Sequence, residues 1–98
     1  MTNNATPNEE QILRLAQSGD TTAMKSLYCR HVRSLTAVCS RSIALDDDVK
    51  DVMQEAFLRI FSSLRRFEYR GDGSFRAWMS RSVVNASLKH IRRGQRLD

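Results

Sequence analysis

Aromatic rings and arginine side chains alternate in residues 67–81, FEYRGDGSFRAWMSR. Guanidinium groups attract phosphates, and flat rings accept nucleic-acid bases that have left their stack. The glycines inside the segment predict a loop with a concave corner, in which one turned-out base would fit. Ser80 and Asn85 follow and offer hydrogen-bond partners for the edge of such a base. These residue types favour a partner that carries phosphates and unstacked bases.

The four aromatic residues of this segment differ in their spacing. Phe67, Phe75 and Trp78 fit the period of an apolar core, so burial is the simpler interpretation of each. Tyr69 fits no core period and is the best candidate for an exposed stacking ring. A base stacked on one aromatic ring contributes about 1–3 kcal/mol of binding free energy. The substitution Tyr69→Ala is therefore expected to weaken single-strand binding without unfolding the domain.

Basic residues are concentrated in the second half of the chain. Residues 1–58 contain six Lys and Arg against eight Asp and Glu, whereas residues 59–96 contain ten against two, a net charge of +8. A basic half indicates a polyanionic partner, with nucleic acid ahead of a membrane surface. From charge alone, the alternative is a basic face that is merely solvated.

Several classes of function lack their sequence signals. There is no nucleophile elbow, phosphate-binding glycine loop or HExxH motif, and His31 and His90 have no obvious triad partners. The acidic triplet at residues 46–48 is better explained by the start of a helix than by a metal site, because carboxylates cap free N–H groups and favour the positive end of the helix dipole. We therefore expect no enzymatic activity, no metal and no cofactor. A signal peptide and a spanning apolar run are both missing, so a cytoplasmic protein is expected.

The elements that must position these residues are predicted to be helices. One proline and four glycines among 98 residues favour an all-α domain over a fold of many short strands. Apolar spacing predicts four helices, over about residues 8–18, 20–43, 46–67 and 75–93. Residues 1–7 are expected to be flexible, and Asp72 or Ser74 would cap the fourth helix. The expected architecture is a compact bundle of about four helices.

The third of these helices has a polar stripe opposite its apolar face. The stripe follows a spacing of three and four residues and consists of Asp51, Gln54, Glu55, Leu58, Arg59 and Ser62. An acidic and polar stripe that contains an exposed leucine could bind a basic partner helix. Taken alone, the same stripe is also typical of a solvated face.

A long segment from residue 47 to residue 93 carries a family resemblance. Its sequence, DDVKDVMQEAFLRIFSSLRRFEYRGDGSFRAWMSRSVVNASLKHIRR, resembles region two of bacterial RNA polymerase sigma factors, and the most similar branch is the small extracytoplasmic-function (ECF) type. The upstream LAQSGDTTAMKSLYCRHV resembles the start of the same domain. The distinctive motifs are D-V-x-Q-E-x-F-L-R, the aromatic-glycine loop, and F-R-x-W followed by V-N-x-x-L-x-x-I-R-R.

The resemblance implies an all-helical sigma region 2 domain over residues 8–94. Residues 95–98 would then begin a linker to a C-terminal domain, absent here, that binds the promoter −35 element. A complete sigma factor has both domains, so initiation would not be the whole activity of this chain. Many such factors are held inactive by an anti-sigma protein, which makes an anti-sigma factor a possible partner.

The resemblance also implies two binding surfaces. One docks on the clamp helices, a coiled coil of the polymerase β′ subunit, and its residues are Asp51, Gln54, Glu55, Leu58 and Arg59. The other recognises and helps to melt the promoter −10 element by capturing flipped bases of the single-stranded non-template DNA. Its residues are Tyr69, Arg70, Gly71, Asp72, Gly73, Ser74, Arg76, Trp78, Ser80, Arg81, Val84, Asn85, Lys89, Arg92 and Arg93. Relatives often have a larger, frequently aromatic residue in place of Ser80.

Two other functions remain open from the residues themselves. A generic duplex-DNA-binding domain would insert the fourth helix in a groove and would bind duplex more tightly than single strand. A protein-interaction module without a nucleic-acid role would use the basic half for an acidic partner and would bind neither.

Overall fold

The computed structural model describes residues 8–96, and the regular structure in that range is helical. In chain order the elements are α1 (Glu9–Gln17), α2 (Thr21–Ser40), α3 (Asp46–Ser62), the short 3-10 helix η1 (Leu64–Arg66) and α4 (Ser74–Arg96). The predicted all-α bundle of about four helices is confirmed. The predicted flexible residues 1–7 lie outside the described residues, as do positions 97 and 98 of the predicted linker. Positions 95 and 96 of that linker continue α4.

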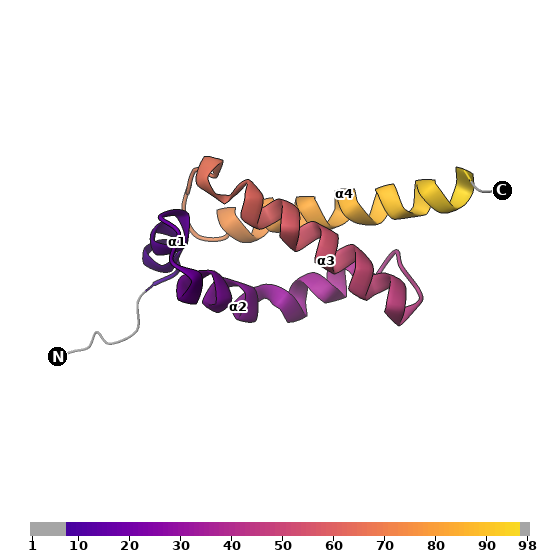
Figure 1. Cartoon of the computed structure of the whole chain (residues 1–98), viewed down its shortest axis with the longest axis horizontal. Helices are drawn as coiled ribbons and strands as arrows, with labels where there is room; N and C mark the ends of the chain where they lie inside the picture. Colours follow the sequence, from indigo (N-terminus) through magenta and orange to yellow (C-terminus); the bar gives the residue numbers. More distant parts are fainter. Residues whose placement is uncertain (1–7, 97–98) are drawn as a thin grey trace.

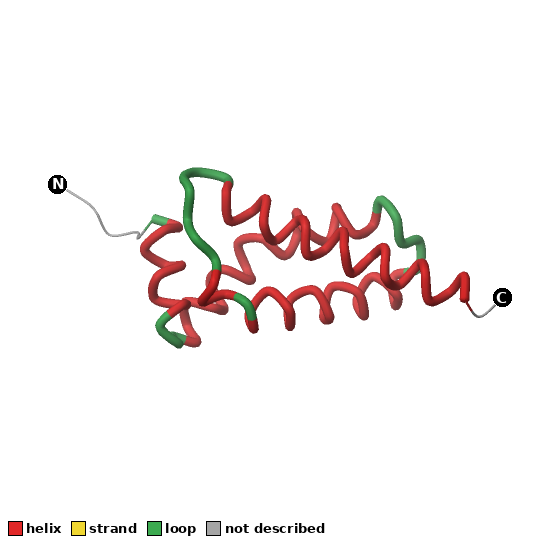
Figure 2. The backbone as a smooth tube through the Cα atoms, turned by 90° about the horizontal axis from the view of Figure 1, so that it is seen from above, coloured by secondary structure: helices red, strands yellow, loops and turns green. Residues whose placement is uncertain are grey.

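Three long helices form the body of the bundle, and α1 lies at one end (Figure 1). α2 packs on both α3 and α4, α3 packs on α4, and α1 packs on α2 and η1. The loop that joins η1 to α4 lies at the same end as α1, whereas the loop between α2 and α3 lies at the opposite end (Figure 2). The loop between η1 and α4, which contains the predicted base-binding residues, therefore lies at one end of the bundle.

Side-chain caps begin the first two helices. Asn8 Oδ1 accepts the N–H of Gln11 at 2.9 Å, and Gln11 Oε1 accepts the N–H of Asn8 at 3.0 Å, which is a capping box. Asp20 caps α2 by accepting the N–H of Ala23 at 2.9 Å. Gly19, with φ of 104°, makes the turn between the two helices.

The third helix is shorter than its apolar pattern predicted. We expected it to continue to Phe67, but α3 ends at Ser62 and η1 follows. The Ser62 hydroxyl donates to the carbonyl of Arg59 at 3.0 Å, a local bond typical of serine near a helix end. The amide of Gln17 on α1 donates to the carbonyls of Leu64 and Phe67, both at 2.9 Å. These two bonds hold the turn that directs the chain into the loop before α4.

The helix start predicted at the acidic triplet is confirmed, but the side-chain cap predicted there is not found, and the cap predicted at Ser74 is wrong. The residue before α3 is Leu45, which makes no side-chain cap bond, and the acidic triplet at residues 46–48 occupies the first turn instead. Its carboxylates still lie near the positive end of the helix dipole. Ser74 is the first residue of α4 rather than its cap, and its hydroxyl bonds to the preceding loop at Arg70 and Gly71.

The apolar faces of the helices meet in one core. The largest side chains that are buried almost completely are Phe75, Leu13, Leu27, Leu35, Ile60, Leu64, Met79, Val83 and Cys39. His31 lies at the edge of this core, where its Nε2 is 2.6 Å from Glu9 Oε2 and its ring meets Phe75 edge-on. His90 pairs instead with Asp48, at 3.6 Å. The two histidines thus have separate carboxylate partners.

Within residues 8–96, no group of three or more His, Cys, Asp or Glu side chains is arranged so that it could hold a metal ion. Within the same range, none of the helices combines the length and the apolar character that crossing a bilayer requires.

Candidate nucleic-acid interface

The loop between η1 and α4 is closed by one side chain. Ser74 Oγ accepts the N–H of Arg70 at 3.0 Å and donates to the carbonyl of Gly71 at 2.8 Å. Gly71 and Gly73 have φ of 106° and 85°, which residues with a Cβ rarely adopt. A Cβ added at either glycine would meet no atom within 4 Å, so backbone conformation rather than space favours glycine here. The loop is therefore already ordered in the free protein.

Tyr69 is less exposed than its sequence position predicted. Its side chain is half-buried and packs against the core. Its hydroxyl donates to Asp72 Oδ1 at 3.3 Å. Desolvation, together with the hydrogen bond to Asp72 and the negative charge of that carboxylate, raises the pKa of Tyr69 above its ordinary value. Whether this ring contacts a base stays a prediction.

An open groove of about 510 Å³ lies beside this loop, and we call it the aromatic groove. Phe67 and Trp78 supply its rings, with centroids 5.0 Å apart and planes inclined at 39°. Arg66, Arg70 and Arg81 line it as well. The remaining lining residues are Glu68, Ser74 and Ala77. This arrangement could hold a flat ring against an aromatic surface while guanidinium groups meet the attached phosphates.

The predicted burial of three aromatic residues in the core is correct for one of them and only partly correct for the other two. Phe75 is completely buried, whereas Phe67 and Trp78 are half-buried and reach the groove. Arg66 was not among the predicted binding residues, although it lines the same groove. It was missed because the sequence pattern placed it on a continuous helix, whereas in the structure it belongs to η1.

Most of the other predicted DNA-binding side chains lie along α4. Ser80 is half-buried there. The predicted α4 residues that are exposed are Arg76, Arg81, Val84, Asn85, Lys89, Arg92 and Arg93. Five of these seven are basic, so α4 presents a run of positive charge that continues from the aromatic groove toward the C-terminal end of the helix.

A second groove, of about 440 Å³, lies between α3 and α4, and we call it the inter-helix groove. Its lining residues are Glu55, Arg59, Ser82, Asn85, Ala86, Leu88, Lys89 and Arg92. Glu55 is 3.6 Å from the ammonium of Lys89 and 3.6 Å from the guanidinium of Arg93. The structure therefore brings the two predicted surfaces together, since a predicted polymerase contact pairs with two predicted phosphate contacts.

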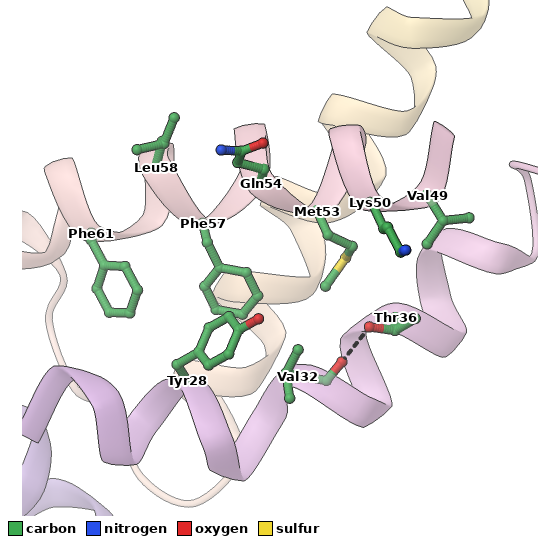
Figure 3. A pocket seen from close by; sticks show the side chains of 10 residues that line it. All are labelled: Tyr28, Val32, Thr36, Val49, Lys50, Met53, Gln54, Phe57, Leu58 and Phe61. Carbon is green, nitrogen blue, oxygen red and sulfur yellow. Dashed lines mark hydrogen bonds between the residues drawn. The ribbon is translucent and has the colours of Figure 1, made fainter. Parts of the chain in front are cut away.

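The rest of the polar stripe is exposed on α3. Asp51, Gln54, Leu58 and Arg59 are all exposed, and at 68% Leu58 is the most exposed large hydrophobic residue in the described part of the chain. Gln54 and Leu58 project from the side of α3 that points away from α2 (Figure 3). This geometry leaves an apolar side chain among polar ones on an open helix face.

An apolar groove of about 480 Å³ between α2 and α3 adjoins the polar stripe (Figure 3). Tyr28 of α2 lies edge-on to Phe57 of α3, with ring centroids 4.7 Å apart. Gln54 and Leu58 also line this groove. Although its ring packs on Phe57, 42% of the surface of Tyr28 is exposed.

Comparison with known protein families gives one domain match. Residues 27–97 match the family described as Sigma-70 region 2.

Two curated proteins are similar over most of this chain. The RNA polymerase sigma-H factor of Pseudomonas aeruginosa is 29% identical over 89 residues, which is 90% of this chain and 45% of that protein. The ECF RNA polymerase sigma-E factor of Escherichia coli K12 is 32% identical over 83 residues, which is 85% of this chain and 42% of that protein. The chain therefore spans less than half the length of these relatives.

A solved structure has the same fold over almost the full length of both chains. It is the NMR structure of a complex formed by an engineered region 2 of sigmaE with GTAAAA. The TM-score is 0.83 and the sequence identity 27%, and the match covers 98% of this chain and 99% of that one.

Proposed function

Because the chain belongs to the Sigma-70 region 2 family, we propose that it docks on core RNA polymerase and captures unstacked bases of the promoter −10 element. In this proposal α3 faces the clamp helices of the β′ subunit. The aromatic groove and α4 face the single-stranded non-template DNA. The proposal does not include an enzymatic activity. It does include action in the cytoplasm and control by an anti-sigma factor.

The observation that carries the DNA-binding half is the composition of the aromatic groove. Two half-buried rings, Phe67 and Trp78, lie among three arginines at the start of a basic helix. Bases stack on such rings without regard to sequence, and arginines neutralise the phosphates between them. The similar sigmaE domain that was solved with GTAAAA supports a single strand as the ligand.

Because the loop beside it is ordered in the free protein, the aromatic groove would be ready to capture bases and so help to open promoter DNA. The bonds of Ser74 to Arg70 and Gly71 already fix the loop, so little conformational entropy remains to be lost on binding. A base that leaves its stack is then captured by a prepared surface. Capture of successive bases would shift the equilibrium from duplex toward open strands.

The docking half rests on the exposed stripe of α3. Leu58 offers an apolar anchor, and Asp51, about two turns earlier on the same stripe, offers a carboxylate to a basic partner helix. Interfaces commonly obtain most of their binding energy from a few desolvated residues within a polar rim, and in this proposal Leu58 is one of them. The adjoining apolar groove gives a partner helix more apolar surface to cover.

Fluorescence of Trp78 tests the DNA-binding half directly, because the chain has no other tryptophan. Titration with single-stranded GTAAAA is expected to quench this fluorescence. The slope of log affinity against log salt should steepen by about 0.7 for each phosphate contact. A matched duplex is the comparison. Tighter binding to the duplex would favour the generic duplex-binding function, and binding to neither would favour a protein-interaction module.

Binding to core RNA polymerase tests the docking half. The variant Asp51→Asn with Leu58→Ser changes the exposed stripe and introduces no cation that could compete for the Glu55 ion pairs with α4. We expect the wild-type chain to bind the polymerase or its isolated β′ coiled coil, and the variant to lose binding while retaining its circular-dichroism spectrum and its affinity for GTAAAA. Equal binding of both proteins would contradict docking through α3.

A further inference from the structure

His31 of α2 is held by a carboxylate of α1. Its Nε2 lies 2.6 Å from Glu9 Oε2, and the two side chains are 12% and 24% exposed, respectively. An ionised carboxylate has no proton to donate, so the N–H at Nε2 donates this bond and Glu9 sets the orientation of the imidazole ring. The guanidinium of Arg30 lies 3.8 Å from the same oxygen and adds a cation beside the carboxylate. The ring is therefore oriented by a partner on another helix.

The same ring packs on the buried residue beneath the aromatic groove. The rings of His31 and Phe75 have centroids 5.9 Å apart and planes inclined at 79°. Rings in this edge-to-face arrangement attract each other beyond the effect of the area that they bury. Phe75 in turn contacts Phe67 at a centroid distance of 5.3 Å and Trp78 at 5.9 Å. His31 is thus one ring away from both rings of the groove, although it does not line the groove itself.

The helix that holds His31 is joined to the groove at a second point. Gln17, the last residue of α1, donates its amide to the carbonyl of Phe67 at 2.9 Å. Glu9 is the first residue of the same helix. Both ends of α1 are therefore connected to the aromatic groove, one through the backbone of Phe67 and the other through His31 and Phe75. α1 itself contributes no lining residue to the groove.

We infer that His31 is a positioning residue for base capture. Its ring, oriented by Glu9, supports Phe75 and so fixes how the two groove rings lie relative to each other. A base stacks well only on a ring that is held at a defined angle and depth, so loss of this support weakens stacking without removing any group that touches DNA. The inference rests on the proposed function and names a further residue that acts on the same site.

The first test separates the ring of His31 from its hydrogen bond. His31→Phe keeps a ring on Phe75 but cannot bond to Glu9, whereas His31→Gln keeps a hydrogen-bond donor and loses the ring. We expect His31→Phe to bind single-stranded GTAAAA within about twofold of wild type, and His31→Gln to bind about three- to tenfold less tightly, which corresponds to the loss of one aromatic pair. Fluorescence anisotropy of a labelled strand measures both affinities.

A control variant distinguishes positioning from a general loss of stability. Ile43→Val shortens a buried side chain in the loop between α2 and α3, at the opposite end of the bundle from the aromatic groove (Figure 2). It should lower stability in urea and leave the affinity for GTAAAA unchanged. In the free protein, His31→Gln should alter the emission maximum of Trp78 and its quenching by acrylamide, whereas Ile43→Val should leave both as in wild type.

The second test concerns the partner of His31. Glu9→Ala and Glu10→Ala remove the same charge from the first turn of α1, but Glu10 pairs with Arg14 instead of His31. Without Glu9 the imidazole can turn toward water, so Glu9→Ala should weaken binding of GTAAAA about two- to fivefold. Loss of a negative charge alone would tighten binding of DNA, which is the direction expected for Glu10→Ala. In a His31→Phe background the two alanine variants should bind with equal affinity.

The outcomes separate this inference from the proposed function. If wild type binds GTAAAA and His31→Gln binds equally well, the role of His31 is overturned while the DNA-binding function stands. The same holds if His31→Phe is as weak as His31→Gln, because the ring then takes no part. If wild type does not bind, both are overturned. Circular dichroism checks the fold of every variant, and the comparison of Glu9→Ala with Glu10→Ala decides if His31→Gln does not fold.

Discussion

The rings of Phe67 and Trp78 lie 5.0 Å apart although a loop separates them in the chain. Each also packs on buried Phe75, at centroid distances of 5.3 Å for Phe67 and 5.9 Å for Trp78. Phe75 therefore fixes both rings from beneath and leaves part of each at the aromatic groove. The surface that we propose to bind unstacked bases is in this way built directly on the core.

Trp78→Ala should weaken binding of single-stranded GTAAAA. Loss of one stacking surface is worth about 1–3 kcal/mol, which corresponds to roughly fivefold to more than a hundredfold in affinity. Fluorescence anisotropy of a labelled strand measures this without the tryptophan. Trp78→Phe keeps a ring on Phe75 and should retain most of the affinity. Equal affinity of Trp78→Ala and wild type would remove this ring from the DNA-binding surface.

Alanine at either loop glycine should destabilise the domain through backbone strain. Gly71 and Gly73 have positive φ and open space around them, so the cost arises from conformation and is about 1–2 kcal/mol at each position. Urea unfolding monitored by circular dichroism measures it. Gly94 is the matched control because it lies within α4 with equally open space. Gly94→Ala should be neutral or stabilising by up to about 1 kcal/mol, and a similar loss there would contradict the strain argument.

The sequence predicted the helices and most of the core because both depend on local spacing. Val49, Val52, Ala56 and Ile60 follow a helical period and are buried. Leu64 continues this period and is also buried, although α3 ends before it. Burial survived that error because a 3-10 turn rotates the chain by a similar amount per residue as an α-helix.

The features that sequence reasoning missed depend on contacts between distant segments. The turn at η1 is held by Gln17, which lies 47 positions before Leu64. Glu55 of α3 pairs with Lys89 and Arg93 of α4, and periodicity within either helix alone contains no information on such pairs. Tyr69 looked exposed because it lies outside any helix, yet the folded loop places it against the core.

Gln17→Ala should destabilise the domain and disturb the aromatic groove. It removes two hydrogen bonds of 2.9 Å to the carbonyls of Leu64 and Phe67. The Leu64 carbonyl keeps the N–H of Phe67 at 3.1 Å, so the main cost, about 1–3 kcal/mol, arises from the partly buried carbonyl of Phe67. Urea unfolding measures the stability, and the emission maximum of Trp78 reports on the groove. Gln54→Ala, on the exposed face of α3, is the control and should change stability by less than about 0.5 kcal/mol. Equal effects of the two variants would show that the bonds of Gln17 do not hold the turn.

Replacement of Asp72 should lower the pKa of Tyr69. Desolvation and the contact with the Asp72 carboxylate both favour the neutral phenol, so the folded-state pKa is raised above about 10, the ordinary value. A raised folded-state pKa means that the contribution of Tyr69 to stability is complete below the unfolded-state pKa and is lost as pH rises through the folded-state pKa. The loop contact should therefore weaken in alkaline solution above about pH 10.

Ultraviolet absorbance of the phenolate measures this titration in a Tyr28→Phe background, where Tyr69 is the remaining tyrosine. Asp72→Asn should move the titration to lower pH, since it removes the negative charge that opposes phenolate formation. Glu68→Gln removes a carboxylate close by in sequence that makes no hydrogen bond to the Tyr69 hydroxyl, and it should leave the curve nearly unchanged. An identical curve for Asp72→Asn and its parent would mean that the hydroxyl of Tyr69 is not paired with Asp72 in solution, and that the loop is held by Ser74 alone.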